Sequence, residues 1–347
     1  MKTITIGGKI LNRGYKGIVM DSFNTDTNDN NTLYNELKTS NPKHITLMGI
    51  NENIKIDNKD IEEILKLIKS NYKKVLVKKF VYVSFFFGSS DKNFKNEIDG
   101  YKKLMSIFKD NISKYTTVKK GFTYNKIDIY GIIFNNNYYV FLEKCFKTLE
   151  NIQFTNKTLN KCLKDIMETL DILNANDYIH NDIKPDNIIL CKNRFKLIDW
   201  ESSNYIKDQA NTFINTRNGN LTFNHPIKFY RIGLFYHFYK YIYDLEIETY
   251  HYLKDLKNPK IITDAVNQSF NQVINKQKEL AKIKDKSSKS KKQSLSFNEI
   301  KENKDFYLKL SDYFSFALIL IYMAEKNKID IPKITHSILS HYFITIS

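Results

Sequence analysis

The chain has 347 residues, of which 42% are hydrophobic and 27% charged, a balance that is typical of a globular protein and excludes an intrinsically disordered chain. The formal net charge of +16 raises the question of nucleic-acid or acidic-membrane partners, but the lysines are spread along the chain and form no patterned basic and aromatic surface. The densest run, at 282–292, has the composition of a solvated linker, with a polyanion-docking tail as the alternative, so we do not expect nucleic acid as a partner.

The first half of the chain is rich in predicted strands. Alternating apolar and polar residues predict two short strands within 3–19, and the Asn-, Asp- and Thr-rich residues 21–60 predict an inserted loop. The elements predicted next are a short helix at 60–70, a strand at 74–84, an amphipathic helix at 93–109, and strands at 127–134 and 138–143.

The pattern changes to helix from residue 160 onward, and a lobe boundary near 144–148 fits this change. An apolar stripe at helical spacing runs from Leu163 to Leu173, and a second, strongly apolar helix is predicted at 312–323. The sequence therefore predicts an α+β protein of two lobes: a strand-rich lobe at 1–145 with an insertion near 21–73, and a helical lobe at 146–347 with an insertion near 228–305.

The cysteines and apolar segments indicate in which cellular compartment the protein is expected and whether it crosses a membrane. Cys145, Cys162 and Cys191 form an odd and sparse set without metal-ligand spacing, so we expect neither a disulfide nor a zinc site. The N-terminus lacks a signal-peptide stretch, and the apolar run at 314–324 is too short to cross a bilayer. We expect a soluble protein in a reducing, intracellular compartment, the cytoplasm or, if the source is a virus, the host cell or virion.

The segment 178–201, YIHNDIKPDNIILCKNRFKLIDWE, concentrates polar residues between apolar ones. Asp182, Lys184 and Asn187 fall in a loop between a helix and a strand, and Asp199 follows the next apolar strand. A polar turn is the plain alternative, because Asx-rich loops are common. The joint match of these positions to one pattern is stronger evidence than any one of them alone.

Together with His180 and Pro185, this segment resembles the catalytic loop and metal-binding segment of protein kinases, HRDxKxxN followed by DFG. The resemblance implies a two-lobed kinase fold, Mg2+ and ATP as cofactors, and a protein partner with a Ser/Thr acceptor hydroxyl. It implies that Asp182 orients the hydroxyl and that Lys184 neutralises the transferred phosphate. Asn187 and Asp199 are the implied metal ligands.

The same resemblance implies an ATP site upstream. Residues 11–19, LNRGYKGIV, resemble the GxGxxGxV loop that covers the phosphates, with Asn in place of the first Gly. The residues implied to contact the nucleotide there are Leu11, Asn12, Gly14, Gly17 and Val19. An ordinary hairpin turn is the alternative.

A lysine and a glutamate complete the implied phosphate site. Lys78, in VLVK, resembles the strand lysine that holds the α and β phosphates, and Glu97 on the amphipathic helix is its implied ion-pair partner. Lys79 is a rival for this register. A solvent-exposed lysine and a surface glutamate are the plain alternative.

Residues 138–145 resemble the last strand of the first lobe and the hinge. Backbone groups around Glu143 and Cys145 are implied to bond adenine, and Ile189 is implied to lie beneath it. Asp312 begins DYFSFA, which resembles the DxWSxG motif whose aspartate braces the catalytic loop through backbone amides. A charge favourable to the helix dipole is the alternative. Residues 222–226 stand where an activation segment ends.

Departures from the family pattern limit what can be expected. Trp200 and Glu201 replace the Phe and Gly of DFG, so we do not expect the familiar flip of that motif. Asn181 replaces the Arg of HRD, so we do not expect control by activation-loop phosphorylation. Two alternative functions stay open: a small-molecule kinase resembling the aminoglycoside and choline phosphotransferases, and a pseudokinase scaffold.

Overall fold

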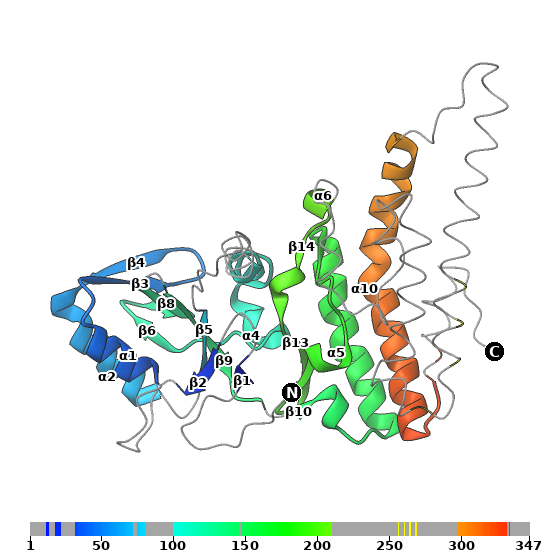
Figure 1. Ribbon diagram of the computed structural model, residues 1–347, viewed down its shortest axis with the longest axis horizontal. Coiled ribbons are helices and arrows are strands. Elements are labelled where there is room, and N and C mark those ends of the chain that lie inside the picture. The colour runs from blue at the N-terminus through cyan, green and yellow to red at the C-terminus, as the bar shows by residue number, and fades with distance from the viewer. Residues whose placement is uncertain are drawn as a thin grey trace. The chain divides into compact units, whose positions relative to one another are not determined.

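Figure 1 shows the computed structural model, which describes residues 12–13, 18–21, 32–71, 75–80, 100–135, 137–145, 147–209, 256, 260, 264, 268, 297–331 and 333. The chain divides into two compact units. The first unit comprises Met1–Phe146 and Leu190–Glu201, and the second comprises Lys147–Ile189 and Ser202–Ser347. The chain therefore leaves the first unit after Phe146 and returns to it for twelve residues, 190 to 201.

The first unit is built on a seven-stranded sheet with the order β1-β2-β5-β9-β8-β3-β4. Every pairing in it is antiparallel. The strands are β1 (Asn12–Arg13), β2 (Ile18–Asp21), β3 (His44–Met48), β4 (Asn53–Asp57), β5 (Val75–Phe80), β8 (Gly131–Phe134) and β9 (Asn137–Glu143). Asn135, with a φ of 48°, supports the short turn between β8 and β9, since Asn tolerates the left-handed region.

The prediction of a loop at 21–60 was wrong, because this stretch contains a helix and two strands of the sheet. After α1 (Leu33–Ser40), β3 pairs with β8 and β4 pairs with β3, and α2 (Ile61–Asn71) follows. The Oγ1 of Thr32 caps α1 by accepting from the Asn35 N–H at 3.2 Å. The Asn- and Asp-rich composition is concentrated before residue 32, and it hid the apolar alternation that follows.

A hydrophobic core fills the space between α1, α2 and the sheet, and in Figure 1 the two helices lie together along one side of the strands. The helices contribute apolar residues at helical spacing, and the strands contribute alternate residues. The main buried members are Leu33, Leu37, Ile45, Leu47, Ile64, Ile68, Val77, Ile132, Tyr139 and Phe141. A small hairpin of β6 (Phe122–Tyr124) and β7 (Ile127–Ile129) adds Phe122 and Ile129 to this core.

Shorter elements are also described in the first unit. Residues 100–108 are helical, and the turn Lys109–Asn111 joins them to α4 (Ile112–Tyr115). The strand β12 (Ile188–Cys191) brings the chain back to the first unit and bonds to β13 (Arg194–Leu197).

The second unit is mainly helical, and α5 (Asn156–Ala175) and α10 (Phe297–Asn327) run side by side in it (Figure 1). Thr155 caps α5 by accepting from the Thr158 N–H at 3.2 Å. Residues 311–324 of α10 are all buried, as expected for a helix that is apolar on every side. The helix predicted at 312–323 thus lies within a longer one. Among the described residues, we find no helix with the length and hydropathy needed to cross a membrane.

The other elements that the structure describes in the second unit are short. They are β10 (Lys147–Thr148), β11 (Tyr178–Ile179), β14 (Asn204–Tyr205) and α6 (Ile206–Gln209), with single turns at Leu149–Asn151 and Pro185–Asn187. β11 and β14 pair antiparallel, so the segment just before the polar loop is bonded to the segment that follows residue 202.

Candidate functional site

The polar loop after β11 is folded around the side chain of Asp182. Asn187 donates from Nδ2 to the main-chain oxygen and to Oδ2 of Asp182, each at 2.9 Å. Lys184 donates from Nζ to the same Oδ2 at 2.9 Å. Asp182 is 6% exposed and Asn187 4%. Three residues singled out in the sequence therefore form one contiguous, largely buried cluster within the second unit.

The local sequence explains why the loop takes this shape. Pro185 begins a single 3-10 turn, for which its fixed φ is suited, and the Asn187 N–H closes the turn on the Lys184 carbonyl at 2.9 Å. Ile183 and Ile188, on either side of the turn, are 1% and 0% exposed. These two apolar anchors hold the ends of the turn, so that Asp182, Lys184 and Asn187 converge.

The carboxylate of Asp312, in α10, accepts two backbone hydrogen bonds from the start of the loop. The His180 N–H donates to Oδ2 at 2.6 Å, and the Asn181 N–H donates to Oδ1 at 3.0 Å. Asn181 has a φ of 67°, which suits an Asn better than most residues. The predicted brace of the loop by Asp312 is confirmed, and at 3% exposure the carboxylate is a buried charge satisfied by donors.

Asp199 lies in the first unit, two residues after β13 ends at Leu197. It is half-buried and has a φ of 63°, an uncommon backbone conformation that clusters at functional sites. Trp200 is 1% exposed and packs edge-on against Phe108, with ring centroids 6.5 Å apart. The residue that replaces the Phe of the kinase motif is therefore anchored in the core of its own unit.

The strand register distinguishes Lys78 from Lys79 at the level of the backbone. Lys78 is directly opposite Val19 on β2 and Val140 on β9, whereas Lys79 is opposite Ile18 and Tyr139. Residues directly opposite share a face of the sheet, and neighbours along a strand lie on opposite faces. Lys78 therefore shares a face with Val19, and Lys79 shares the face of Tyr139, a member of the hydrophobic core.

Several residues implied by the resemblance fall outside the part of the chain that the structure describes. These are Leu11, Gly14, Gly17 and Glu97, together with the segments 222–226 and 282–292. Asn12 is described as part of β1, where it pairs with Val19 of β2. Ile189 is half-buried in β12, in the second unit.

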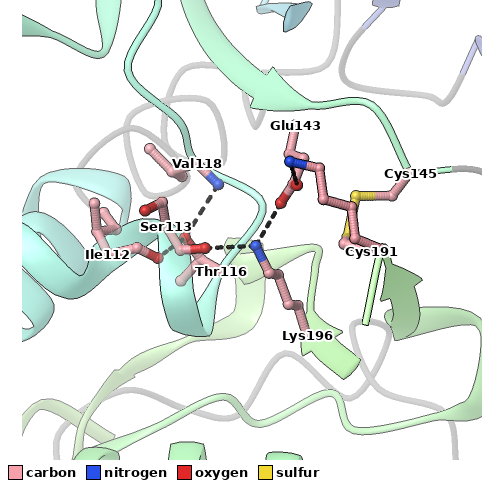
Figure 2. A network of polar contacts seen from close by, with 9 residues as sticks. Ile112, Ser113, Thr116, Val118, Glu143, Cys145, Cys191 and Lys196 are labelled. Atoms are coloured by element: carbon pink, nitrogen blue, oxygen red, sulfur yellow. Dashed lines mark hydrogen bonds and ion pairs between the residues drawn. A yellow bond between two sulfur atoms is a disulfide. The ribbon is translucent and has the colours of Figure 1, made fainter. Parts of the chain in front are cut away.

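Cys145 and Cys191 form a disulfide in the first unit, which Figure 2 shows beside Glu143. The prediction of no disulfide was wrong. The two residues are 46 positions apart, but the segment after β9 and the end of β12 lie next to each other, with the Cα atoms 4.8 Å apart. Sequence spacing cannot show that two cysteines 46 positions apart lie in contact. The expectation of a reducing compartment rested on the absence of a disulfide, so it no longer has that support. Cys162 is a buried free thiol.

Glu143, at the end of β9, is held by a cation that the sequence analysis missed. Lys196 donates from Nζ to Oε2 of Glu143 at 2.5 Å, and Lys192 lies 3.5 Å from Oε1. Burial by itself would raise the pKa of Glu143, but the hydrogen bond and charge of Lys196, helped by two further lysines, hold this pKa below its usual value. The available signal in the sequence was a lysine inside the apolar strand FKLI, between Phe195 and Leu197.

The Glu143 carboxylate and the two cysteine sulfurs lie within 4.8 Å of one another. Such a group could hold a metal ion if the sulfurs were free thiolates. Here the sulfurs are bonded to each other and the carboxylate is paired with Lys196, so the group does not offer thiolate ligands. The Glu143 N–H also has a partner, because it donates to the Thr117 carbonyl at 2.7 Å.

Residues 60–226 match the family model of the protein kinase domain. The mitogen-activated protein kinase kinase MKK2 of Pyricularia oryzae is 44% identical over 63 residues, which cover 17% of this chain and 12% of that protein. The dual specificity protein kinase zak2 of Dictyostelium discoideum is 34% identical over 99 residues, covering 24% of this chain and 15% of that protein. The chain thus spans only a small part of the length of these relatives.

Among solved structures, the yeast RNA Pol II CTD kinase CTDK-1 complex includes a chain that is 18% identical to this one, with a TM-score of 0.34. The match covers 46% of this chain and 48% of that chain.

Proposed function

Because this chain belongs to the eukaryotic-type protein kinase superfamily, we propose that it is a serine/threonine protein kinase that transfers the γ-phosphate of Mg-ATP to a protein hydroxyl. The observation that carries the proposal is the buried cluster of Asp182, Lys184 and Asn187, held in place by Asp312. A polar surface turn would not need a buried carboxylate, 132 residues after His180, to fix its first two amides.

In the proposed reaction the acceptor hydroxyl lies against Asp182, which takes its proton as the alcohol oxygen forms the new bond to the γ-phosphorus. The bond from that phosphorus to the bridging oxygen breaks, and ADP leaves. Lys184, now paired with Asp182 at 2.9 Å, is near enough to place its charge beside the transferred group. The two residues therefore divide the work of orienting the acceptor and neutralising the phosphoryl oxygens.

Asn187 and Asp199 are the residues proposed to hold Mg2+. Asn187 directs its amide nitrogen at Asp182, so its side-chain oxygen is the atom that would face a cation. A carboxylate and an amide oxygen are hard ligands of the kind that Mg2+ prefers. When bound, the ion would neutralise charge on the β- and γ-phosphates.

The nucleotide is proposed to bind along the first unit. The register that puts Lys78 on the face of Val19 supports Lys78 over Lys79 as the phosphate-binding lysine, with Glu97 as its partner. The loop of Leu11, Asn12, Gly14 and Gly17 would cover the phosphates. Backbone groups around Glu143 and Cys145 would bond adenine above Ile189, using atoms other than the Glu143 N–H, which is already bonded to Thr117.

The preference for Ser/Thr acceptors rests on the Lys184-Pro185 pattern alone. One of the relatives carries the name of a dual specificity kinase. The small-molecule alternative draws on the IDWE segment around Asp199. The brace from Asp312, which the resemblance assigns to protein kinases, favours a protein acceptor. Retention of the charged positions Asp182, Lys184 and Asp199 argues against a scaffold without activity.

The test is phosphate incorporation from radiolabelled Mg-ATP into basic and acidic generic protein substrates, with an Asp182→Asn variant in parallel. We expect wild type to label Ser and Thr in phosphoamino-acid analysis, and the variant to be slower by about 100-fold or more. Aminoglycosides and choline are offered as competing acceptors. Equal incorporation by wild type and variant would refute the proposal, and labelling confined to the small molecules would replace it with the alternative.

A further inference from the structure

Lys196 carries its charge in the interior of the first unit. The residue is 5% exposed, and its neighbours Phe195 and Leu197 are each 0% exposed. A buried ammonium is costly to desolvate unless it is paired and hydrogen-bonded. Figure 2 shows how this cost is met: Nζ lies 2.5 Å from Oε2 of Glu143 and 2.5 Å from the main-chain oxygen of Ser113.

These two contacts join three segments that are distant in sequence. Ser113 belongs to α4, Glu143 ends β9, and Lys196 lies in β13. The segment after α4 lies between the other two, because Leu197 forms a parallel bridge with Thr116 and Leu142 forms an antiparallel bridge with Val118. Lys196 therefore adds a side-chain link to the backbone bridges that already join β9, the segment at 112–118 and β13.

The segment at 112–118 has little freedom to move away from Lys196. The Thr116 side chain donates to the Ile112 carbonyl at 2.9 Å and accepts from the Val118 N–H at 3.1 Å, as Figure 2 shows. The next carbonyl, that of Thr117, accepts from the Glu143 N–H at 2.7 Å. Glu143 is thus fixed twice, through its backbone by Thr117 and through its carboxylate by Lys196.

We propose that Lys196 is a positioning residue for the nucleotide, which holds the backbone from Glu143 to Cys145 in a fixed relation to the strand that leads to Asp199. The inference rests on the function proposed above, in which that backbone bonds adenine and Asp199 binds the metal. Lys196 is three positions before Asp199 and contacts Glu143 directly, so it links the two ends of the proposed nucleotide site within the first unit. It touches neither the nucleotide nor the reacting atoms.

The test compares Lys196→Met with Lys192→Met in the full chain. Lys192 is the matched control, because it approaches the same carboxylate at 3.5 Å but has a side chain that is 77% exposed. The dissociation constants of Mg-ATP and Mg-ADP are measured by calorimetry. We expect Lys196→Met to raise them by roughly 10- to 100-fold, as for other residues that orient a binding group, and Lys192→Met to change them less than about twofold.

Hydrogen exchange supplies a readout that does not depend on the nucleotide. The Glu143 N–H, bonded to Thr117, and the Lys119 N–H, bonded to the Phe141 carbonyl at 3.0 Å, report on the held segments. Both amides should exchange faster in Lys196→Met and not in Lys192→Met. Reduced stability with unchanged dissociation constants would overturn the inference, because it would make Lys196 merely structural.

A gentler variant covers the case in which Lys196→Met does not fold. Glu143→Gln keeps an oxygen that can accept from Lys196 but removes the opposing charge, and we expect a rise of a few-fold in the same dissociation constants, with kcat changed less than KM. Unchanged constants in Glu143→Gln would also overturn the inference. If the wild-type chain binds no nucleotide, both the proposed function and this inference are refuted. If wild type, Lys196→Met and Glu143→Gln bind nucleotide with the same dissociation constants, only this inference is refuted.

Discussion

The disulfide between Cys145 and Cys191 gives a prediction with a magnitude that can be worked from the chain itself. The bond closes a loop over a sequence separation of 46 residues. The loss of chain entropy in the unfolded state, taken as 2.1 plus 1.5R times the logarithm of loop length, is roughly 13 to 14 cal/mol/K, or about 4 kcal/mol at 25 °C. This is a large fraction of the roughly 5–15 kcal/mol that stabilises a typical domain.

The perturbation is Cys145→Ala, Cys191→Ala and the double variant, each followed by urea denaturation with and without dithiothreitol. Alanine is preferred to serine because Cys191 is only 2% exposed and a buried hydroxyl would add its own cost. Because the bond joins the two residues, each single variant should lose the full cross-link, and the double variant should lose little more. Reduction of the wild type should have the same effect, and dithiothreitol should not shift any of the variants.

Cys162→Ala is the matched control, since Cys162 is a free thiol that is 0% exposed. Its stability should fall through the lost packing alone, and the wild-type response to dithiothreitol should persist in it. The reasoning is refuted if reduction leaves the wild-type unfolding midpoint in place and the costs of the two single substitutions simply add.

Two further predictions concern carboxylates with bonded partners, the buried Asp312 and the half-buried Glu143. Asp312→Ala should lower the free energy of unfolding by about 2–4 kcal/mol and speed hydrogen exchange at the His180 and Asn181 amides. Asp312→Asn should be less damaging because it keeps an acceptor oxygen. Unchanged hydrogen exchange at those two amides in Asp312→Ala would contradict the role of Asp312 as a brace. The lowered pKa of Glu143 stabilises the folded state above its unfolded pKa of about 4.5 and ceases to do so as pH falls through the folded value. Urea denaturation from pH 6 to pH 3 should therefore show a steeper acid loss in wild type than in Glu143→Gln, and parallel curves would count against the ion pair with Lys196.

The parts of the fold that the sequence predicted are those set by local patterns. The stripe of α5 and the polar loop from Asp182 to Asn187 lie within single contiguous segments, where helical spacing, Pro185 and the Asx residues determine the conformation directly. The contact with Asp312 is distant in sequence and could be predicted only through the resemblance to a family motif.

The parts that the sequence did not predict depend on which segments meet in the folded chain. The strand β3 joins the sheet by pairing with β8 and β4 joins it by pairing with β3, and a composition rich in Asn and Asp concealed both strands. Lys196 and Glu143 are 53 positions apart, and the sequence alone does not indicate that these two residues form an ion pair. The disulfide was missed for the same reason, since an odd and widely spaced set of cysteines gives no pairing by itself.

The hydrogen bond from the His180 N–H to Asp312 also bears on how the chain is made. The two residues are 132 positions apart, and at about 5–20 residues per second a ribosome needs roughly 7 to 26 seconds to travel from one codon to the other. Throughout that interval the nascent loop possesses its polar side chains but lacks the carboxylate that braces it. A translation product ending before residue 312 would carry every residue of the loop and still leave its first two amides without their support.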